Sequence, residues 1–339
     1  MDKDFLYDPL LDDELLGDQL MTSAVARIRA KENTLLTDQD LKSLMACPTY
    51  SECIQYLLDR GWGPTEHVTP EELLALEKDR MWELIGSLLT AQDAKVFDIF
   101  RLSSDFHNLK AAIKESYIQK TVPDVYMEGG TIDVQTLRRC AADADFSALP
   151  LVMMRAAEEA RDVLFRAGDS QLCDVIIDKA CLDSIQKAAE ESGNSLLKEY
   201  AEFKCAAANI NIAIRACRAG KDEEFLKKAF ARCSSISTQK LIGSARNGID
   251  AIYEYLEQTV YKDAADAIKE SPAAFDRWCD NRMIELIRPQ KYNAFTISPL
   301  AAYVLAKECE IKSVRLILSG KLNHLPEEKI RERLRESYV

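Results

Sequence analysis

The chain has 339 residues, of which 47% are apolar and 29% charged, and its formal net charge is −12. This charge argues against nucleic acid as the main partner, because phosphate binding needs clustered lysines and arginines, and it argues equally against direct adhesion to an anionic membrane. With 12 glycines and 10 prolines, the chain has few turn residues, which favours helices over a β-rich fold.

Helix signals recur along the whole chain. Residues 1–18 hold seven acids and form a predicted acidic leader, and a first helix begins at Leu20. Thr69-Pro70-Glu71-Glu72 supplies a capping hydroxyl, a proline for the first turn and two acids, which predicts another helix start. Apolar residues then recur every three or four positions over residues 73–89, 96–102, 149–165, 196–217 and 300–318. No segment alternates long enough to predict a strand, so we expect an all-α fold.

No stretch approaches the roughly 20 consecutive apolar residues that a membrane-spanning helix needs. The N-terminus also lacks the apolar region of a signal peptide. We therefore expect a cytoplasmic protein that is peripheral to the membrane and reaches it only through partners. The ten cysteines include no Cys-x-x-Cys pair, and most lie on apolar helix faces, which indicates reduced structural thiols.

An internal repeat divides the chain into parts of about one hundred residues. Three related nine-residue strings begin at positions 105, 206 and 310, and each has a small polar residue at its fourth position, followed by an aliphatic one. The polar residues are Asn108, Asn209 and Ser313. A second set of matches keeps nearly the same period: Leu41-x-x-Leu44, Leu137-x-x-Cys140 and Leu241-x-x-Ser244.

This period is far above the 20–50 residues of solenoid repeats. We predict three similar helical domains after the acidic leader: residues 19–120, 121–220 and 221–339.

The repeat strings also resemble a known family. Asp105-Phe-His-Asn-Leu-Lys and the segment 299–321 resemble the C subunit of prokaryotic V-type (A-type) ATP synthases, a family that includes the d subunit of the eukaryotic vacuolar ATPase. Segments 24–37, 40–45 and 325–335 resemble the same proteins, so the similarity spans almost the whole chain.

The resemblance implies three helical domains in a funnel with pseudo-threefold symmetry. It also implies a non-catalytic central-stalk (rotor) subunit, a socket that couples the D–F shaft to the membrane proteolipid c-ring in ion-driven ATP synthesis or ATP-driven ion pumping. The coupling ion, proton or sodium, is decided by carboxylates in other chains. Three departures from the family pattern, at Ala206, Cys309 and Ser313, leave the individual contact residues open.

The repeat-signature positions are the candidate site residues. Asp105 and Asn108 are spaced to share one helix face. They either contact a partner or form a hydrogen-bonded pair that locks the helix against its neighbour, and we favour the pair. Glu308, Glu310 and Arg315 form either a solvated charged face or an interface. Lys110 and Asn209 complete the set.

Motifs for catalysis are missing from the sequence. It has no phosphate-binding Gly-x-x-x-x-Gly-Lys-Ser/Thr loop, no Gly-x-Ser-x-Gly elbow and no His-x-x-x-His pair. The acid pair Asp12-Asp13 lacks the second acidic motif that a magnesium site would need. We therefore expect no cofactor, no metal and no active site. The alternatives are a free cytosolic helical scaffold and an all-helical enzyme with an unrecognised pocket.

Overall fold

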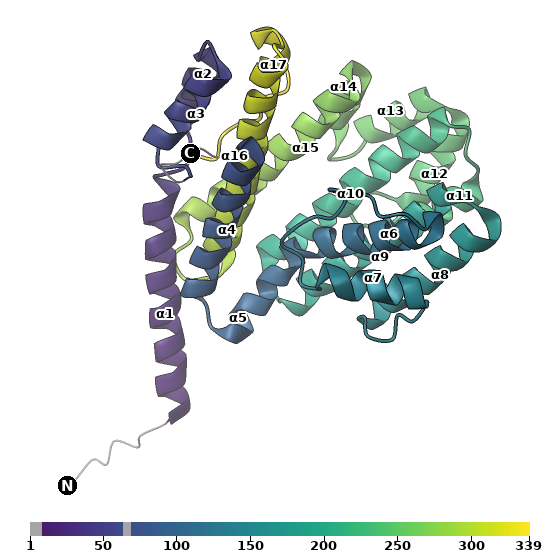
Figure 1. Cartoon of the computed structure of the whole chain (residues 1–339), viewed down its shortest axis with the longest axis horizontal. Helices are drawn as coiled ribbons and strands as arrows, with labels where there is room; N and C mark the ends of the chain where they lie inside the picture. Colours follow the sequence, from purple (N-terminus) through teal and green to yellow (C-terminus); the bar gives the residue numbers. More distant parts are fainter. Residues whose placement is uncertain (1–8, 64–68) are drawn as a thin grey trace. The chain divides into compact units, whose positions relative to one another are not determined.

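The computed structural model describes residues 9–63 and 69–339, with side chains from residue 20 onward (Figure 1). Every regular element in these residues is a helix, which confirms the all-α prediction. The chain forms two compact units: unit 1 comprises residues 1–94 and 270–339, and unit 2 comprises residues 95–269. The three domains predicted from the repeat remain a prediction. The pair Asp12-Asp13 lies outside the described side chains.

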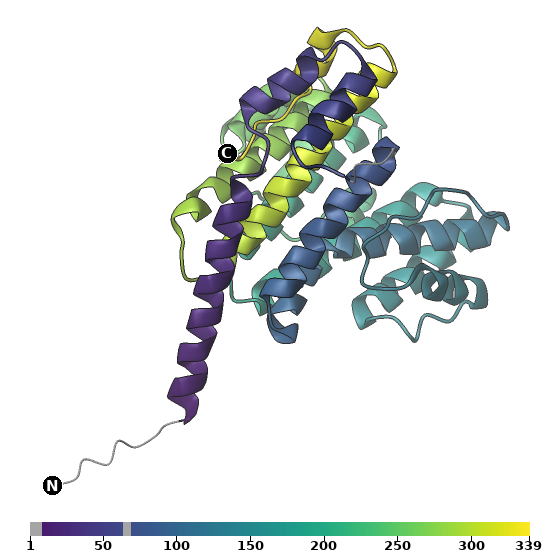
Figure 2. The same cartoon turned by 60° about the vertical axis from the view of Figure 1, so that its left-hand side comes forward.

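Unit 1 is built around α16 (Ser298–Leu322). Most of this helix is apolar and buried, and its few exposed side chains include Lys312 and Arg315. It packs against six helices: α1 (Pro9–Glu32), α2 (Asp38–Ala46), α3 (Tyr50–Asp59), α4 (Pro70–Leu88), α15 (Pro272–Ile287) and α17 (Glu327–Arg331). Figure 2 shows α16 beside α1, and these two helices come from opposite ends of the chain. A 3-10 helix, η2 (Arg288–Tyr292), precedes α16.

The helix starts of unit 1 follow the sequence signals. Thr69 accepts the backbone N–H of Glu72, Glu72 bonds back to Thr69, and Pro70 occupies the first turn of α4, as predicted. Thr37 and Asp40 form the same kind of capping box at α2. The start of α1 differs from the prediction, because this helix already begins at Pro9, inside the acidic leader.

Unit 2 contains two longer helices at its centre, α9 (Ser170–Glu191) and α10 (Ser195–Arg218), which pack against each other. Around α9 lie α6 (Leu102–Ile118), α8 (Leu151–Ala167) and α11 (Glu223–Ala229), and α7 (Val134–Asp143) packs on α6. Around α10 lie α12 (Thr238–Asn247) and α13 (Ile249–Glu257). A 3-10 helix, η1 (Phe97–Phe100), precedes α6. The chain passes between the units at α5 (Ala91–Val96) and α14 (Lys262–Glu270).

All ten cysteines are free thiols, and six of them are buried. None of the described helices combines the length and the apolar character that crossing a membrane requires.

Candidate functional site

The repeat-signature residues of α6 bind the loop that leads into α7. Asn108 makes two hydrogen bonds with the backbone of Met127: its Nδ2 donates to the carbonyl at 2.8 Å, and its Oδ1 accepts from the N–H at 2.7 Å. Asp105 Oδ1 accepts from the backbone N–H groups of Thr131 and Ile132. We call such an arrangement a clamp: side chains of a long helix that bond the backbone of the loop before a shorter helix.

A second clamp joins α10 to the loop before α12. Asn209 makes the same two bonds, here with the backbone of Ala231, at 2.9 and 3.0 Å. Because Ala206 stands where α6 has its acid, Glu202 supplies the carboxylate from one turn earlier. Its Oε1 accepts from the backbone N–H groups of Ser234 and Ser235. The lost acid of the second repeat is therefore replaced by a longer acid on the same helix.

A third clamp joins α16 to the loop before α2. Glu310 Oε1 accepts a hydrogen bond from the backbone N–H of Leu36, 274 positions away in sequence. Ser313, at the position of the two asparagines, is buried, and together with Glu310 and Leu36 it lines a small space that the C-terminal residues also border. The third clamp therefore depends on a carboxylate, without the amide of the other two.

The three clamped loops share a pattern of their own. In each loop an aliphatic residue precedes the N-cap, and a leucine follows at the fourth helical position, which is the spacing of a hydrophobic staple. The sets are Leu36/Thr37/Leu41, Ile132/Asp133/Leu137 and Ile236/Ser237/Leu241. The second set of sequence matches therefore marks the helices that the clamps hold. The first two clamps join α6 and α10 to the loops before α7 and α12, which follow them in the chain. The third clamp joins α16 to the loop before α2, near the start of the chain.

Glu310 also belongs to a buried ion cluster in unit 1. Lys307 Nζ lies 2.7 Å from Glu310 Oε2 and 2.9 Å from Glu77 Oε2, and 4.1 Å from the centre of the Trp62 ring. Arg80 forms a further ion pair with Glu77. Burial raises the pKa of Glu310, although Lys307 opposes the shift. Burial works against the charge on Lys307, but the two carboxylates outweigh it and raise the pKa of the ammonium group.

The remaining predicted residues lie apart from the clamps. Lys110 forms an ion pair of 2.7 Å with Asp178 of α9. Glu308 is half-buried and Arg315 is exposed, whereas Glu310 points into the core. The expected shared charged face of Glu308, Glu310 and Arg315 is therefore wrong for Glu310. The expected Asp105–Asn108 pair is also corrected, since both side chains bond the loop rather than each other.

Sequence reasoning missed Glu77, Lys307 and Glu202. Lys307 had a usable signal: it lies in the middle of the apolar segment 299–318, where a charged side chain is buried only with partners. Glu202 had a weaker one, because it lies one turn before the position where the repeat lacks its acid. Glu77 carried no signal, since α4 also bears several exposed acids.

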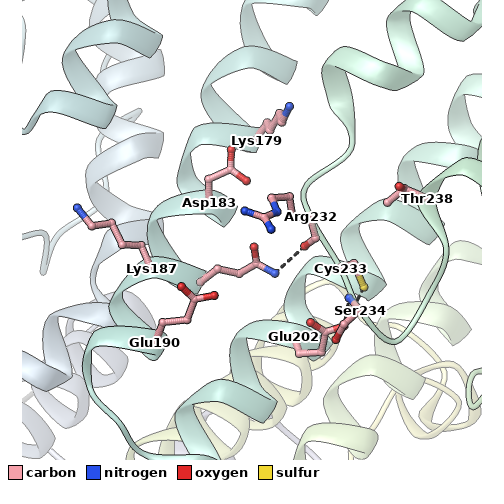
Figure 3. A pocket seen from close by; sticks show the side chains of 10 residues that line it. Lys179, Asp183, Lys187, Glu190, Glu202, Arg232, Cys233, Ser234 and Thr238 are labelled. Atoms are coloured by element: carbon pink, nitrogen blue, oxygen red, sulfur yellow. Dashed lines mark hydrogen bonds between the residues drawn. The ribbon is translucent and has the colours of Figure 1, made fainter.

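A cavity of about 730 Å³ lies in unit 2, beside the second clamp (Figure 3). Lys179, Asp183, Glu190 and Arg232 line it with charges of both signs. Cys233 Sγ donates to Glu202 at 3.0 Å, and burial raises the pKa of its thiol to about 11, so the thiol is not a nucleophile at neutral pH. Among the described residues, no group of three His, Cys, Asp or Glu side chains is placed to hold a metal ion.

The three clamps and the buried ion cluster define an all-helical protein in which buried polar side chains hydrogen-bond the backbone of its own loops. A family model for ATP synthase (C/AC39) subunits matches residues 24–333. The chain belongs to this family.

Its relatives carry matching names. It is 23% identical to the C subunit of the V-type sodium ATPase of Enterococcus hirae, over 79% of this chain and 82% of that relative. It is 22% identical to the C subunit of the A-type ATP synthase of Methanocaldococcus jannaschii, over 91% and 84% respectively. It is 23% identical to the C subunit of the A-type ATP synthase of Pyrococcus horikoshii, over 92% and 89%.

Proposed function

We propose that this chain is a non-catalytic rotor subunit, the socket that couples the D–F shaft to the proteolipid c-ring of a rotary ATPase. The family match over residues 24–333 is the observation that carries the proposal. The chain would then be cytoplasmic and peripheral to the membrane, as a part of the complex. It would serve ion-driven ATP synthesis or ATP-driven ion pumping, according to the complex that holds it.

The clamps support a role in transmitting torque. A connector that passes torque between a ring and a shaft must not shear internally, and loops are the most compliant parts of a helical protein. Here, three loops are bonded to long helices through their backbone N–H groups. Each such bond stabilises by about 1 kcal/mol net, and it also prevents the loop from sliding along the helix.

Burial decides which signature residues could touch a partner. Asp105, Asn108, Asn209 and Glu310 are buried within their own units. We propose that they act inside the socket and stiffen it. Lys110, Glu308 and Arg315 remain as candidates for contacts with the shaft or ring. Interfaces that carry load without slipping bury on the order of 2,000 Å² or more, and the net charge of −12 would orient the protein against basic partner surfaces.

The coupling role is tested on detergent-purified complexes prepared with and without this chain and placed in vesicles. Without it, we expect ATP hydrolysis to continue while ATP-driven ion transport is lost, because the shaft turns without the ring. Adding the purified full-length chain should restore transport. A complex that pumps normally without the chain would refute the role.

Two further results bear on the proposal. Recovery of the chain in the soluble fraction alone, with no proteolipid or D–F proteins attached, would instead support a free scaffold. If titration with salt to molar strength leaves D–F binding unchanged, the electrostatic part of the proposal is wrong.

A further inference from the structure

The loop between α15 and α16 presents two aromatic side chains to solvent. Tyr292 is 92% exposed and Phe295 is 76% exposed. Both lie in residues 288–297, which we call the aromatic loop, and in Figure 2 this loop runs beside α1 to the start of α16. Aromatic side chains gain the most from burial. Two of them held out from one short loop therefore mark a surface that is suited to a partner.

The aromatic loop is fixed in place by a side chain of α1 and by side chains of the loop itself. The Arg29 guanidinium of α1 donates to the carbonyls of Gln290 and Asn293, more than 260 positions away in sequence. The Asn293 amide donates to Gln290 Oε1 at 3.1 Å and to Thr296 Oγ1 at 2.7 Å. The loop is thus ordered before any partner binds, which lowers the entropic cost of association.

The charged residues of the aromatic loop itself are all basic. The chain contains 56 acids, yet none lies between residues 286 and 307, where the charged residues are Arg288, Lys291 and Lys307. Arg288 pairs with Glu336, and Lys307 is buried in the ion cluster. Lys291 lies beside the Tyr338 ring, within a few residues of both exposed aromatics. The loop thus presents apolar area and a positive charge on an otherwise acidic protein.

We propose that the aromatic loop anchors this chain to a neighbouring rotor protein by inserting Tyr292 and Phe295 into an apolar pocket rimmed by carboxylates. Such a rim would pair with Lys291 and accept the Tyr292 hydroxyl. Buried aromatics at the centre of an interface dominate its affinity. The proposal rests on the proposed rotor function and adds the chemistry of one contact.

A protein pocket fits these observations better than a lipid surface does. The net charge of −12 repels anionic headgroups, and one loop with two aromatics offers little area for stable insertion. A preformed pocket, by contrast, uses the fixed geometry that Arg29 and Asn293 impose on the loop.

A photo-crosslinking amino acid placed at position 292 identifies the occupant in the assembled, detergent-purified complex. We expect a crosslink to one rotor protein, at a peptide in which Asp or Glu residues flank apolar ones. The same probe at position 260 is the matched control, because Val260 is 70% exposed but lies in unit 2. Crosslinks to lipid or to a stator protein, or none at position 292, would overturn the proposal.

Binding measurements give a second test. The double variant Tyr292→Ala/Phe295→Ala should bind a complex that lacks this chain at least about tenfold more weakly than wild type, whereas Val260→Ala should bind equally well. Arg29→Ala should show a smaller loss, because it removes the donor to both loop carbonyls but leaves the two aromatic side chains in place. Lys291→Glu should weaken binding by placing a carboxylate against the rim. Circular dichroism checks that each variant is folded.

The two proposals fail in different ways. If wild type does not bind rotor proteins at all, the proposed function is wrong. If wild type binds and the double variant binds equally well, the rotor function stands and only the anchor is refuted.

Discussion

Units 1 and 2 fasten their loops with the same device but in different electrostatic settings. In unit 2, the asparagine amides of α6 and α10 bond both backbone groups of one loop residue, and carboxylates accept further N–H groups nearby. In unit 1, α16 has Ser313 at the amide position, and Glu310 alone bonds the loop. Glu310 is also buried, and it is neutralised by Lys307.

The difference follows from what each clamp joins. The unit 2 clamps hold loops that follow their helix by about 20 to 30 residues, whereas Glu310 bonds a residue 274 positions away. The third clamp thus closes unit 1 from the two ends of the chain. A buried carboxylate carries a large desolvation cost, so this closure also needs Lys307, which in turn needs Glu77. Unit 1 should therefore be much more sensitive than unit 2 to the loss of one charge.

The largest effect is expected from Lys307→Met, which leaves Glu77 and Glu310 buried without their shared cation. Removing one partner of a buried ion pair costs about 3–5 kcal/mol. All three tryptophans, at positions 62, 82 and 278, lie in unit 1, so the tryptophan-fluorescence transition in urea reports this unit.

The matched control is Lys312→Met on the same helix. Lys312 is half exposed and pairs with Asp280 at 2.7 Å, and its loss should cost less than about 1 kcal/mol. Equal shifts of the fluorescence transition in both variants would show that the cluster is not essential for closing unit 1.

The next effect separates the two amide clamps of unit 2. Asn209→Ala removes the hydrogen-bond partner of the backbone N–H and carbonyl of Ala231. Because Ala231 is only 1% exposed, this should lower the free energy of unfolding by about 3 kcal/mol. Asn108→Ala removes the partner of the same backbone groups of Met127. Because Met127 is 46% exposed, water can replace the amide, and the free energy of unfolding should fall by only about 1 kcal/mol.

Urea unfolding followed by far-ultraviolet circular dichroism measures both variants. The tryptophan transition of unit 1 should stay in place. If the order of the two losses is reversed, solvent access does not decide the strength of a clamp.

Local signals were enough to predict most of the fold, but only part of the site. The caps at Thr37 and Thr69 and the strings containing Asn108 and Asn209 depend on neighbouring residues, so they could be found without coordinates. The loop residues that the repeat strings bind come close to them only when the chain folds back on itself, as Leu36 does to reach Glu310. No periodicity encodes that contact. Glu77 shows the same limit, because only packing distinguishes it from the exposed acids of α4.

A smaller effect is expected where the first clamp approaches the backbone closely. A Cβ atom added to Gly130 would lie 2.4 Å from Asp105 Oδ1, so Gly130→Ala must displace the carboxylate that bonds Thr131 and Ile132. We expect a loss of about 1–2 kcal/mol in unit 2.

Gly86→Ala, in α4, is the opposite control. Apart from the neighbouring backbone of α4, no atom lies within 4 Å of its added Cβ, and alanine favours the helix, so unit 1 should gain about 0.5–1 kcal/mol. An unchanged circular-dichroism transition in Gly130→Ala would mean that Asp105 adds little to the first clamp.

The smallest effect is one of pH, and its sign differs between the units. Burial opposes the charge on Glu202, but hydrogen bonds from Ser235, Cys233 and Ser234 outweigh it and hold its pKa below the ordinary 4.5. A lowered pKa stabilises the folded state above pH 4.5, and this stability is lost as the pH falls through the folded value. The stability difference between wild type and Glu202→Gln in unit 2 should therefore stay constant from pH 7 to about pH 4.5 and shrink as the pH falls further.

Glu310 should behave in the opposite way, because burial raises its pKa. A raised pKa stabilises the folded state below the ordinary value of 4.5, and this stability is lost as the pH rises through the folded value. On acidification from pH 7 to pH 4, wild type should therefore gain stability relative to Glu310→Gln in the tryptophan transition. Since each comparison is with a variant at the same pH, the titration of acids distant from the substituted residue cancels. If the stability differences between wild type and the two variants, Glu202→Gln and Glu310→Gln, change in the same direction on acidification, the clamps of the two units share one electrostatic setting.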